Sequence, residues 1–436
     1  MQKIKVIGAG LAGAEAALYL SSHGVEVTLV DIKPNKFTPA HTDKNFAELV
    51  CSNSLKSSDV YGNAAGLLKE EMRRLGSFLI AAADKTKVPA GGALAVNRTE
   101  FSRIITEEIK SRKNIKLVSE EVTSLDGNEL TIVATGPLTT EALSEEISKK
   151  AGGGLYFFDA SAPIVAAESV DMNHAFVGDR YDKGNGDHLN CPMNKEEYEA
   201  FIEALSGAER AELHSFENTA VFEGCMPVEI MAARGKDTLR FGPLKPVGLT
   251  DPKTGRWAYA CLQLRREDES GSMYNLVGFQ TNLKFFEQKR VFSMIPALKN
   301  AEFLRYGVMH RNTFINSPQV LNPDLSLKNA GNVMFAGQIT GVEGYVESAG
   351  TGLLAAIYAE RKIKGKAEKL VPETMVLGAL VKYITTPNPS FQPMNANFGI
   401  MPPLSERIRD KTERKRRIAE RSLSETERFI AETECE

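Results

Sequence analysis

The stretch Ile4-Lys5-Val6-Ile7-Gly8-Ala9-Gly10-Leu11-Ala12-Gly13 decides the fold of this chain. The mainly apolar start predicts a β-strand, the glycines predict a turn, and the alanine-rich sequence up to Leu20 predicts a helix. A second apolar run, residues 25–30, ends at Asp31. A strand, a glycine turn, a helix, a second strand and an acid in this order and spacing indicate a dinucleotide-binding unit of the Rossmann type.

Each residue of this unit has an expected role. Gly8 allows the tight turn, Gly10 lets backbone N–H groups approach a pyrophosphate, and Gly13 lets helix and strand pack closely. The helix N-terminus adds partial positive charge, and Asp31 is placed to accept hydrogen bonds from a ribose diol. The predicted cofactor contacts here are Gly8, Ala9, Gly10, Leu11, Ala12, Gly13 and Asp31.

The composition sets wide limits. A length of 436 residues permits two or three domains, and 42% hydrophobic with 25% charged residues is ordinary for a globular protein. The net charge of −3 means that a polyanionic partner must be bound by a local basic patch. No apolar run has the length of a membrane span. The cysteines are dispersed, which predicts free thiols, a reducing, cytoplasmic location and no metal site: Cys51, Cys191, Cys225, Cys261 and Cys435.

A second glycine-rich turn occurs late in the chain. Residues 332–336 predict a strand, residues 337–344 a turn, and residues 346–361 a long helix. Its distance from Gly13 is explained if an FAD-binding domain is split by an insertion, which favours FAD over NAD. Further cofactor contacts are then expected at Gly337, Gln338 and Gly341. Arg98, at the start of a helix predicted over residues 99–110, is either a surface arginine or a phosphate or flavin contact.

The predicted fold class is therefore α/β, with a Rossmann-like, glutathione-reductase-like FAD-binding domain interrupted by a smaller α+β insertion domain. Short strands are expected at residues 115–118, 122–125 and 130–133, with a hairpin turn at residues 126–128. Residues 401–421 combine eight Lys or Arg with four acids, which indicates either a solvated helix face or a nucleic-acid contact. The predicted division is residues 1–173 and 301–365 for the FAD domain, 174–300 for the insertion, and 366–436 for a helical basic tail.

Two cysteines lie in irregular polar segments that are suited to a ligand crevice. Cys51 follows the second strand of the nucleotide unit, and Cys225 lies between Gly224 and Met226-Pro227. A buried, inert thiol is the usual role of a cysteine, and it is accepted for Cys191, Cys261 and Cys435. Cys51 and Cys225 are predicted to be reactive. The segment after Cys225 is basic and rich in glycine and proline, which is typical of a binding segment: Arg234, Lys236, Arg240 and Lys245.

The chain resembles the bacterial folate- and FAD-dependent tRNA (uracil-54-C5)-methyltransferases over nearly all of its length. The Cys225 segment and residues 309–313 are also similar to the larger glucose-inhibited-division-type wobble-uridine enzymes. Residues 191–198 and the short C-terminal part favour the uracil-54 family. Besides the N-terminal glycine unit, the segments that carry the resemblance are residues 49–54, 157–165, 190–198, 223–248 and 306–314.

The resemblance implies methylene transfer from 5,10-methylenetetrahydrofolate to C5 of a tRNA uracil, completed to a methyl group by reduced FAD with NADPH or NADH as the reductant. It implies thiol addition to uracil C6, assigned to Cys225 with Cys51 assisting, although the order of the two thiols stays open. His310 is expected to stack on the folate pterin. No obligatory protein partner is expected, and wobble-uridine modification or small-molecule flavin oxidation are the alternatives. The expected tRNA contacts are Arg234, Lys236, Arg240, Lys245, Arg414, Arg416 and Arg417.

Overall fold

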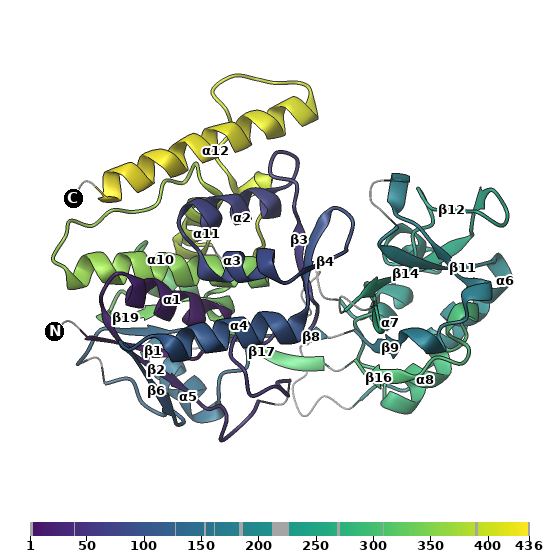
Figure 1. The fold of residues 1–436 in the computed structure, drawn as a ribbon, viewed down its shortest axis with the longest axis horizontal. Helices are drawn as coiled ribbons and strands as arrows, with labels where there is room; N and C mark the ends of the chain where they lie inside the picture. Colours follow the sequence, from purple (N-terminus) through teal and green to yellow (C-terminus); the bar gives the residue numbers. More distant parts are fainter. Residues whose placement is uncertain are drawn as a thin grey trace.

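The protein forms two lobes, seen on the left and right of Figure 1, in a computed structural model. The structure describes residues 3–38, 40–126, 128–151, 154–160, 162–182, 186–211, 226–267, 271–307, 309–388 and 391–434. Of these, residues 154–160, 182, 309–312 and 434 are described by their backbone alone.

A mostly parallel sheet forms the centre of the first lobe, with the strand order β18-β19-β7-β1-β2-β6. Its inner strands are buried on both faces, as their valine- and isoleucine-rich sequences require. Ile7 pairs with Val30 and with Val133, and Val133 pairs with Phe335, so the carboxyl ends of four strands meet at one edge. The strands are β1 (Lys3–Ile7), β2 (Glu26–Asp31), β6 (Ile115–Ser119), β7 (Thr131–Val133), β18 (Ser326–Leu327) and β19 (Ala330–Phe335).

Helices cover both faces of this sheet. α1 and α10 lie against one face, and α5 covers the other together with its own apolar cluster (Figure 1). α1 and α10 approach closely because both are glycine-bearing: a Cβ on Gly352 would lie 2.2 Å from the carbonyl oxygen of Ala12. The helices of this lobe are α1 (Leu11–Ser22), α2 (Ala64–Arg74), α3 (Phe78–Lys85), α4 (Arg98–Ser111), α5 (Glu141–Ala151), α9 (Ser317–Val320), α10 (Tyr345–Ile363), α11 (Val376–Thr385) and α12 (Lys411–Glu434).

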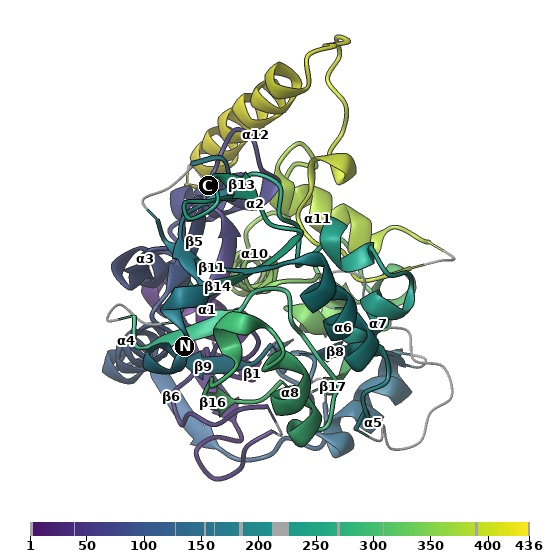
Figure 2. The same ribbon diagram turned by 90° about the vertical axis from the view of Figure 1, so that its right-hand side faces the viewer.

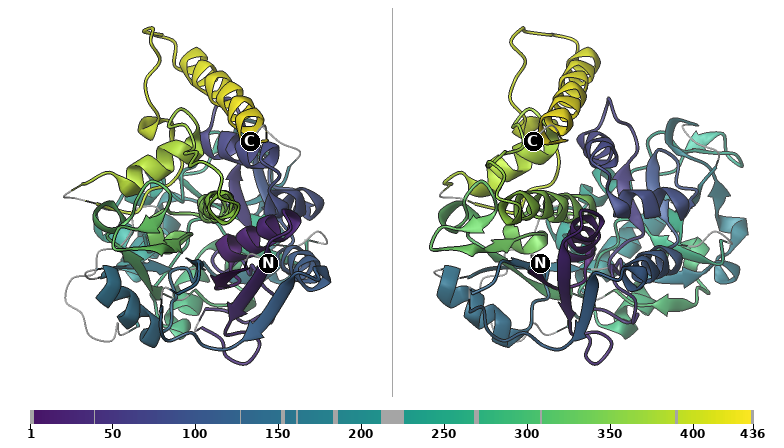
Figure 3. Two further views of the ribbon diagram at one scale, coloured as in Figure 1. Left: turned by 90° about the vertical axis from the view of Figure 1, so that its left-hand side faces the viewer. Right: turned by 60° about the vertical axis from the view of Figure 1, so that its left-hand side comes forward.

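The C-terminal helix α12 is packed onto the first lobe, on the outer side of α2 (Figure 3). Ile418, Leu423 and Phe429 join the main apolar core. Buried Glu71 ties α12 to its neighbours, because it accepts backbone N–H groups at the start of α11 and the hydroxyl of Ser422. The predicted tail is therefore helical, with its apolar face built into the core.

The second lobe has its own core beneath a sheet in the order β10-β11-β14-β15-β9-β16 (Figure 2). β9 and β16 belong to this sheet, although they lie outside residues 174–300, the predicted insertion domain. The predicted domain boundaries stay a proposal. The lobe contains β9 (Ile164–Ala166), β10 (Phe176–Val177), β11 (His188–Met193), β12 (Thr250–Asp251), β13 (Arg256–Trp257), β14 (Ala260–Arg266), β15 (Met273–Leu276), β16 (Phe303–Arg305), α6 (Lys195–Ser206), α7 (Val228–Ala233) and α8 (Phe285–Phe292).

Two small sheets complete the fold. β8 (Gly154–Ala160) pairs antiparallel with β17 (Met309–Ile315) between the lobes, and β3 (Ser54–Ser57), β5 (Ala93–Val96) and β4 (Lys87–Val88) form a three-stranded sheet (Figure 1).

The expected strand at residues 122–125 is wrong. Val122 and Leu125 pack into the cluster under α5 and do not extend the sheet. The expected hairpin is also wrong, because β7 pairs in parallel with β1 and β19. Residue 127 of the expected turn lies outside the described residues.

Candidate active site and cofactor groove

A groove runs along the edge where the carboxyl ends of β1, β2, β7 and β19 meet. Its two connected parts share Gly10, His41 and Ala134, and extend from Asp31 at one end to Cys51 and Tyr345 at the other. This is where open α/β sheets bind ligands. The structure brings most predicted cofactor contacts together here: Gly8, Ala9, Gly10, Leu11, Ala12, Asp31, Gly337 and Gln338.

The remaining predicted glycines serve the packing behind the groove. A Cβ on Gly13 would lie 1.8 Å from the carbonyl oxygen of Gly8, so this position has room only for hydrogen. Gly341 has φ +85°, and a Cβ there would lie 2.4 Å from the ring of Phe391. Both residues allow the glycine turns to form, and neither lines the groove.

The backbone of the first turn fits a dinucleotide. Gly10 caps α1 without a side-chain hydrogen bond, so the first N–H groups of the helix remain for an anion. A Cβ on Gly10 would meet nothing within 4 Å, which shows open space beside the turn. Asp31 accepts the N–H groups of Ala9 (2.6 Å) and Lys33 (2.8 Å) on different oxygens. Each oxygen keeps a lone pair for a ribose hydroxyl.

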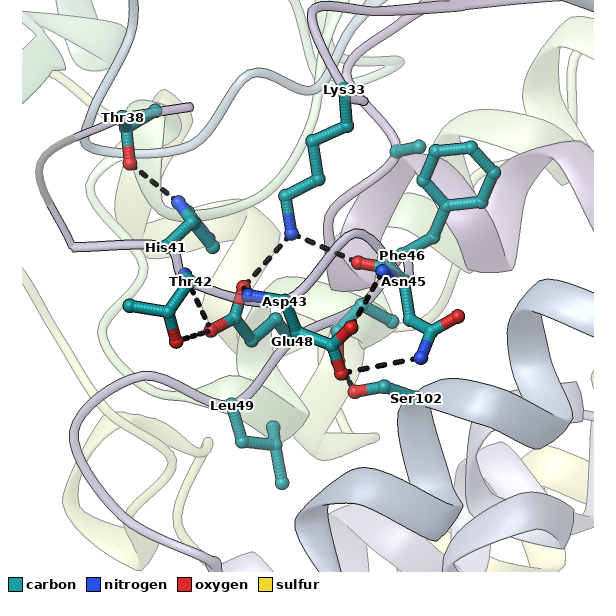
Figure 4. A network of polar contacts seen from close by, with 12 residues as sticks. Lys33, Thr38, His41, Thr42, Asp43, Asn45, Phe46, Glu48, Leu49 and Ser102 are labelled. Atoms are coloured by element: carbon teal, nitrogen blue, oxygen red, sulfur yellow. Dashed lines mark hydrogen bonds and ion pairs between the residues drawn. The ribbon is translucent and has the colours of Figure 1, made fainter. Parts of the chain in front are cut away.

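A polar network forms the rim beside Asp31 (Figure 4). Lys33 Nζ lies 2.9 Å from Glu48 Oε2, and both side chains are largely buried. Although burial alone would raise the pKa of Glu48, hydrogen bonds from Thr42 and Lys33 hold that pKa below its usual value. Burial and the Lys33 charge lower the pKa of His41, whose Nδ1 lies 2.5 Å from Thr38 Oγ1. Sequence reasoning missed these residues because their loop has no periodic pattern.

Cys51 lies at the other end of the groove, against the first residue of α10. Its Sγ is 2.9 Å from Tyr345 Oη, and that oxygen accepts the N–H groups of Cys51 (2.8 Å) and Ser52 (3.2 Å). Both lone pairs of the hydroxyl are then used, which leaves its proton to be donated to sulfur. Burial, and next the neighbouring Cys51, raise the pKa of Tyr345 well above its usual value, so the hydroxyl keeps that proton.

Two arginines hold the segments on either side of Cys51, one through main-chain carbonyls and one through side chains. Arg98 donates to the carbonyls of Leu49 (3.1 Å) and Val50 (3.0 Å), while Arg265 donates to Ser52 Oγ (2.7 Å). Burial lowers the pKa of Arg265, yet a guanidinium stays charged in proteins. Both guanidinium groups interact electrostatically with Cys51.

For Arg98 the surface interpretation is wrong. Only 15% of its side chain is exposed, because it pairs with buried Glu267 at 2.6 Å. Its role as a phosphate or flavin contact stays a prediction. Arg265, Glu267 and Tyr345 were missed by the sequence reasoning, because their approach to Cys51 depends on contacts between the lobes and with α10.

Two of the other four cysteines lie among the described residues. Cys225 and Cys435 lie outside the described residues. His310 is in β17, where its backbone pairs with Asp159 of β8, but its side chain is not described. Cys191 and Cys261 are buried, as predicted. Burial raises the pKa of the Cys261 thiol to about 12 and that of Cys191 well above its usual value.

The predicted tRNA contacts form two groups on different lobes. The second-lobe basic block is Arg234, Lys236, Arg240 and Lys245; Arg234 and Lys236 are exposed, and Arg240 lies over the ring of Tyr259 at 3.7 Å. The tail arginines Arg414, Arg416 and Arg417 are exposed on α12, where Arg416 pairs with Glu420 at 2.9 Å. The structure does not join the two groups into one patch.

Within the described part of the chain, no helix has both the length and the apolar character required to cross a membrane. Among the same residues there is no cluster of three or more His, Cys, Asp or Glu side chains suited to a metal ion.

Comparison with known proteins identifies a sequence family and solved structures that this chain resembles. The sequence model of the family "Glucose inhibited division protein A" matches residues 3–367. Two crystal forms of GidA from Aquifex aeolicus share the fold: TM-scores are 0.69 and 0.68 at 16% identity, over 98% and 99% of this chain and 76% of theirs. This likeness confirms the predicted α/β, Rossmann-like fold class.

Relatives of similar length carry a more specific name. A protein of Acetivibrio thermocellus is 56% identical over 430 residues, covering 98% of both chains. One of Caldicellulosiruptor bescii is 56% identical over 425 residues (97% of both), and one of Lactobacillus gasseri 53% over 434 residues (99% of both). All three are named methylenetetrahydrofolate–tRNA-(uracil-5-)-methyltransferase TrmFO. This chain therefore belongs to the TrmFO family of enzymes.

Proposed function

We propose that this enzyme makes 5-methyluridine at position 54 of tRNA, with 5,10-methylenetetrahydrofolate as the carbon donor and reduced FAD as the reductant. NADPH or NADH is the proposed source of electrons. The observation that carries the proposal is the position of Cys51: it lies under Tyr345, in a groove formed by two glycine turns. Family membership and the names of the relatives support the choice of tRNA and folate.

The groove supports FAD as the resident cofactor. Residues 8–12 and Asp31 would hold its pyrophosphate and ribose, and the second turn at Gly337 and Gln338 would meet the part nearer Cys51. When bound and reduced, FAD supplies a hydride.

The protein's task in this reaction is to make uracil C5 nucleophilic. A thiolate adds to C6, which forms a C–S bond and moves electron density to C5. C5 then bonds to the methylene carbon as the first of its two C–N bonds to the folate breaks. A base removes the C5 proton, the second C–N bond breaks to release tetrahydrofolate, and hydride addition to the exocyclic methylene completes the methyl group as the thiolate leaves C6.

We assign the nucleophile to Cys225 and the removal of the C5 proton to Cys51; the reverse assignment is the alternative. The contacts of Cys51 suit a base, because a thiolate there accepts a hydrogen bond from the Tyr345 hydroxyl and lies between segments held by Arg98 and Arg265. A thiolate positioned in this way can accept a proton.

Substrate binding is proposed for three further sets of residues. His310 is assigned to the folate pterin, and the second-lobe basic block with the tail arginines to tRNA phosphates. The target uracil must leave its stack to reach the groove, so base flipping is part of the proposal.

One assay separates this function from its alternatives. The purified holoenzyme is incubated with methylenetetrahydrofolate, NADPH and unmodified tRNA, and modified nucleosides are mapped. We expect 5-methyluridine at position 54 and none without the folate. Modification of a wobble uridine indicates the larger relatives' reaction, while NADPH oxidation on a small substrate without tRNA modification indicates a flavin oxidoreductase. A Cys225→Ala variant that methylates at the wild-type rate would eliminate the assigned nucleophile.

A further inference from the structure

The second lobe contains a pocket that shares no residue with the cofactor groove. It lies between the β12–β13 hairpin, the short helix η2 (Met172–His174) and the start of α6. Lys253 at the hairpin tip donates to the carbonyl of Asn173, which holds the hairpin over the pocket. One wall is formed by residues 192–195, part of a segment that carries the family resemblance and has no part in the groove chemistry.

This pocket combines aromatic faces with cations. Trp257, the single tryptophan of the chain, lines it together with Tyr259, and Trp257 is 55% exposed. Lys253 and Arg256 form no ion pair with any residue that the structure describes, and Lys195 reaches Glu199 only at 3.9 Å. Two carboxylates also line the pocket, but each accepts a backbone N–H group: Glu197 from Asn194 and Asp251 from Lys253. Exposed rings beside a lining with more cations than anions suit a ligand that has both a base and a phosphate.

The pocket is continuous with the second-lobe basic block. Arg240 lies 3.7 Å over the ring of Tyr259 and donates to the Tyr259 carbonyl at 2.9 Å. Tyr198, beside Tyr259, donates to the carbonyl of Lys236 at 2.6 Å. Cations therefore extend beyond the pocket, which fits one nucleotide within a longer polyanion better than a free nucleotide.

We propose that this pocket binds an unpaired nucleotide of the tRNA substrate, with its base on Trp257 and its phosphate on Lys253 or Arg256. An unpaired base is required because both faces of a paired base are covered by its neighbours in a helix. The inference rests on the proposed function and adds a second contact with tRNA, separate from the flavin groove.

The test uses the holoenzyme and its tryptophan fluorescence. Because Trp257 is the single tryptophan of the chain, this signal reports directly on the pocket. A T-arm stem–loop RNA is titrated while tryptophan fluorescence and acrylamide quenching are followed. We expect saturable quenching by the RNA and at least about 3-fold protection from acrylamide. Trp257→Ala should raise KM for tRNA about 10-fold with kcat within about 2-fold, and Trp257→Phe should restore most of the loss.

Phe286→Ala is the matched control, since Phe286 is 57% exposed in the same lobe and does not line the pocket; its KM should not change. An unprotected Trp257, or a Trp257→Ala variant with wild-type KM in an enzyme that methylates tRNA, overturns the proposal. Protection by NADPH but not by RNA also overturns it, because the pocket then takes a free dinucleotide. A wild-type enzyme that makes no 5-methyluridine contradicts the proposed function instead.

Discussion

The cofactor groove and the second-lobe pocket are built in opposite ways. The part of the groove assigned to the dinucleotide is formed largely by main chain, and the helices behind it pack closely where Gly13 of α1 and Gly352 of α10 leave no space for a Cβ. The pocket is formed by side chains such as Trp257, Lys253 and Arg256 on an exposed hairpin. A binding surface made of backbone is rigid and generic, whereas one made of exposed side chains can be altered without changing the fold. Cofactor binding and tRNA recognition should therefore respond differently to mutation.

The largest effect is expected in the backbone behind the groove. Gly13→Ala and Gly352→Ala place a Cβ 1.8 Å and 2.2 Å from main-chain oxygens that cannot rotate away. We expect a loss of more than about 3 kcal/mol of stability and of bound flavin, measured by thermal denaturation and flavin absorbance. Gly92→Ala, where a Cβ meets nothing within 4 Å, is the control and should retain both. Normal flavin content in the Gly13 variant would contradict a backbone-defined groove.

The next effect concerns chemistry at the end of the groove. Cys51→Ala removes the proposed base, so methylation should fall at least about 100-fold while flavin stays bound. Tritium release from C5 of labelled tRNA uracil measures the step directly. Cys261→Ala, a buried thiol in the second lobe, should stay within about 3-fold of the wild type. Equal rates of tritium release in the Cys51 variant and the wild type would rule out this role.

Tyr345→Phe should have a smaller effect on the same step. The variant loses the hydroxyl that donates to Cys51 Sγ and accepts two backbone N–H groups. We expect about 10-fold slower methylation and slower alkylation of Cys51 by iodoacetamide at neutral pH. Tyr358→Phe, which removes another buried hydroxyl from α10, should leave the alkylation rate unchanged. If Cys51 is alkylated at the same rate in the Tyr345→Phe and Tyr358→Phe variants, Tyr345 only supports the fold.

Charge reversal on α12 should change binding and leave chemistry intact. The double change Arg416→Glu and Arg417→Glu removes two exposed cations. We expect tRNA affinity to fall about 10-fold. The slope of log affinity against log salt concentration should become less steep by roughly 1.5 to 2. Filter binding at several salt concentrations measures both. Arg428→Glu on the same helix is the control, since Arg428 is an exposed, ion-paired arginine like Arg416 but is not one of the predicted tRNA contacts. Unchanged affinity in the double variant would remove α12 from the binding surface.

The smallest effect on catalysis is expected from a change in the attachment of α12, which acts on stability. Burial raises the pKa of Glu71 from 4.5 to about 7, so the folded state binds its proton more tightly than the unfolded state. The resulting stabilisation is full below pH 4.5 and is lost as pH rises through about 7, by at most about 3 kcal/mol. Glu71→Gln should therefore gain thermal stability relative to the wild type between pH 5.5 and pH 8. Glu70→Gln on the same helix is the control, and parallel profiles for wild type and Glu71→Gln would refute the assignment.

The sequence predicted the parts of the groove that depend on local backbone. Gly8 to Asp31 and Gly337 to Gln338 could be read from glycine spacing and strand patterns, because those signals lie within one strand–turn–helix unit. Tyr345, Arg265 and Glu48 could not, because their positions depend on contacts between segments far apart in the chain. The strand expected at residues 122–125 failed for a related reason: its two apolar residues, Val122 and Leu125, serve equally to pack beneath a helix.

The origin of the methyl group tests the central claim most directly. The holoenzyme is given methylenetetrahydrofolate deuterated at its methylene carbon, NADPH and unmodified tRNA, and the nucleoside at position 54 is analysed by mass spectrometry. We predict a methyl group that keeps both deuterons of the folate and gains one hydrogen from the reduced flavin. An unlabelled methyl group at position 54, or no methyl group there, would contradict the account.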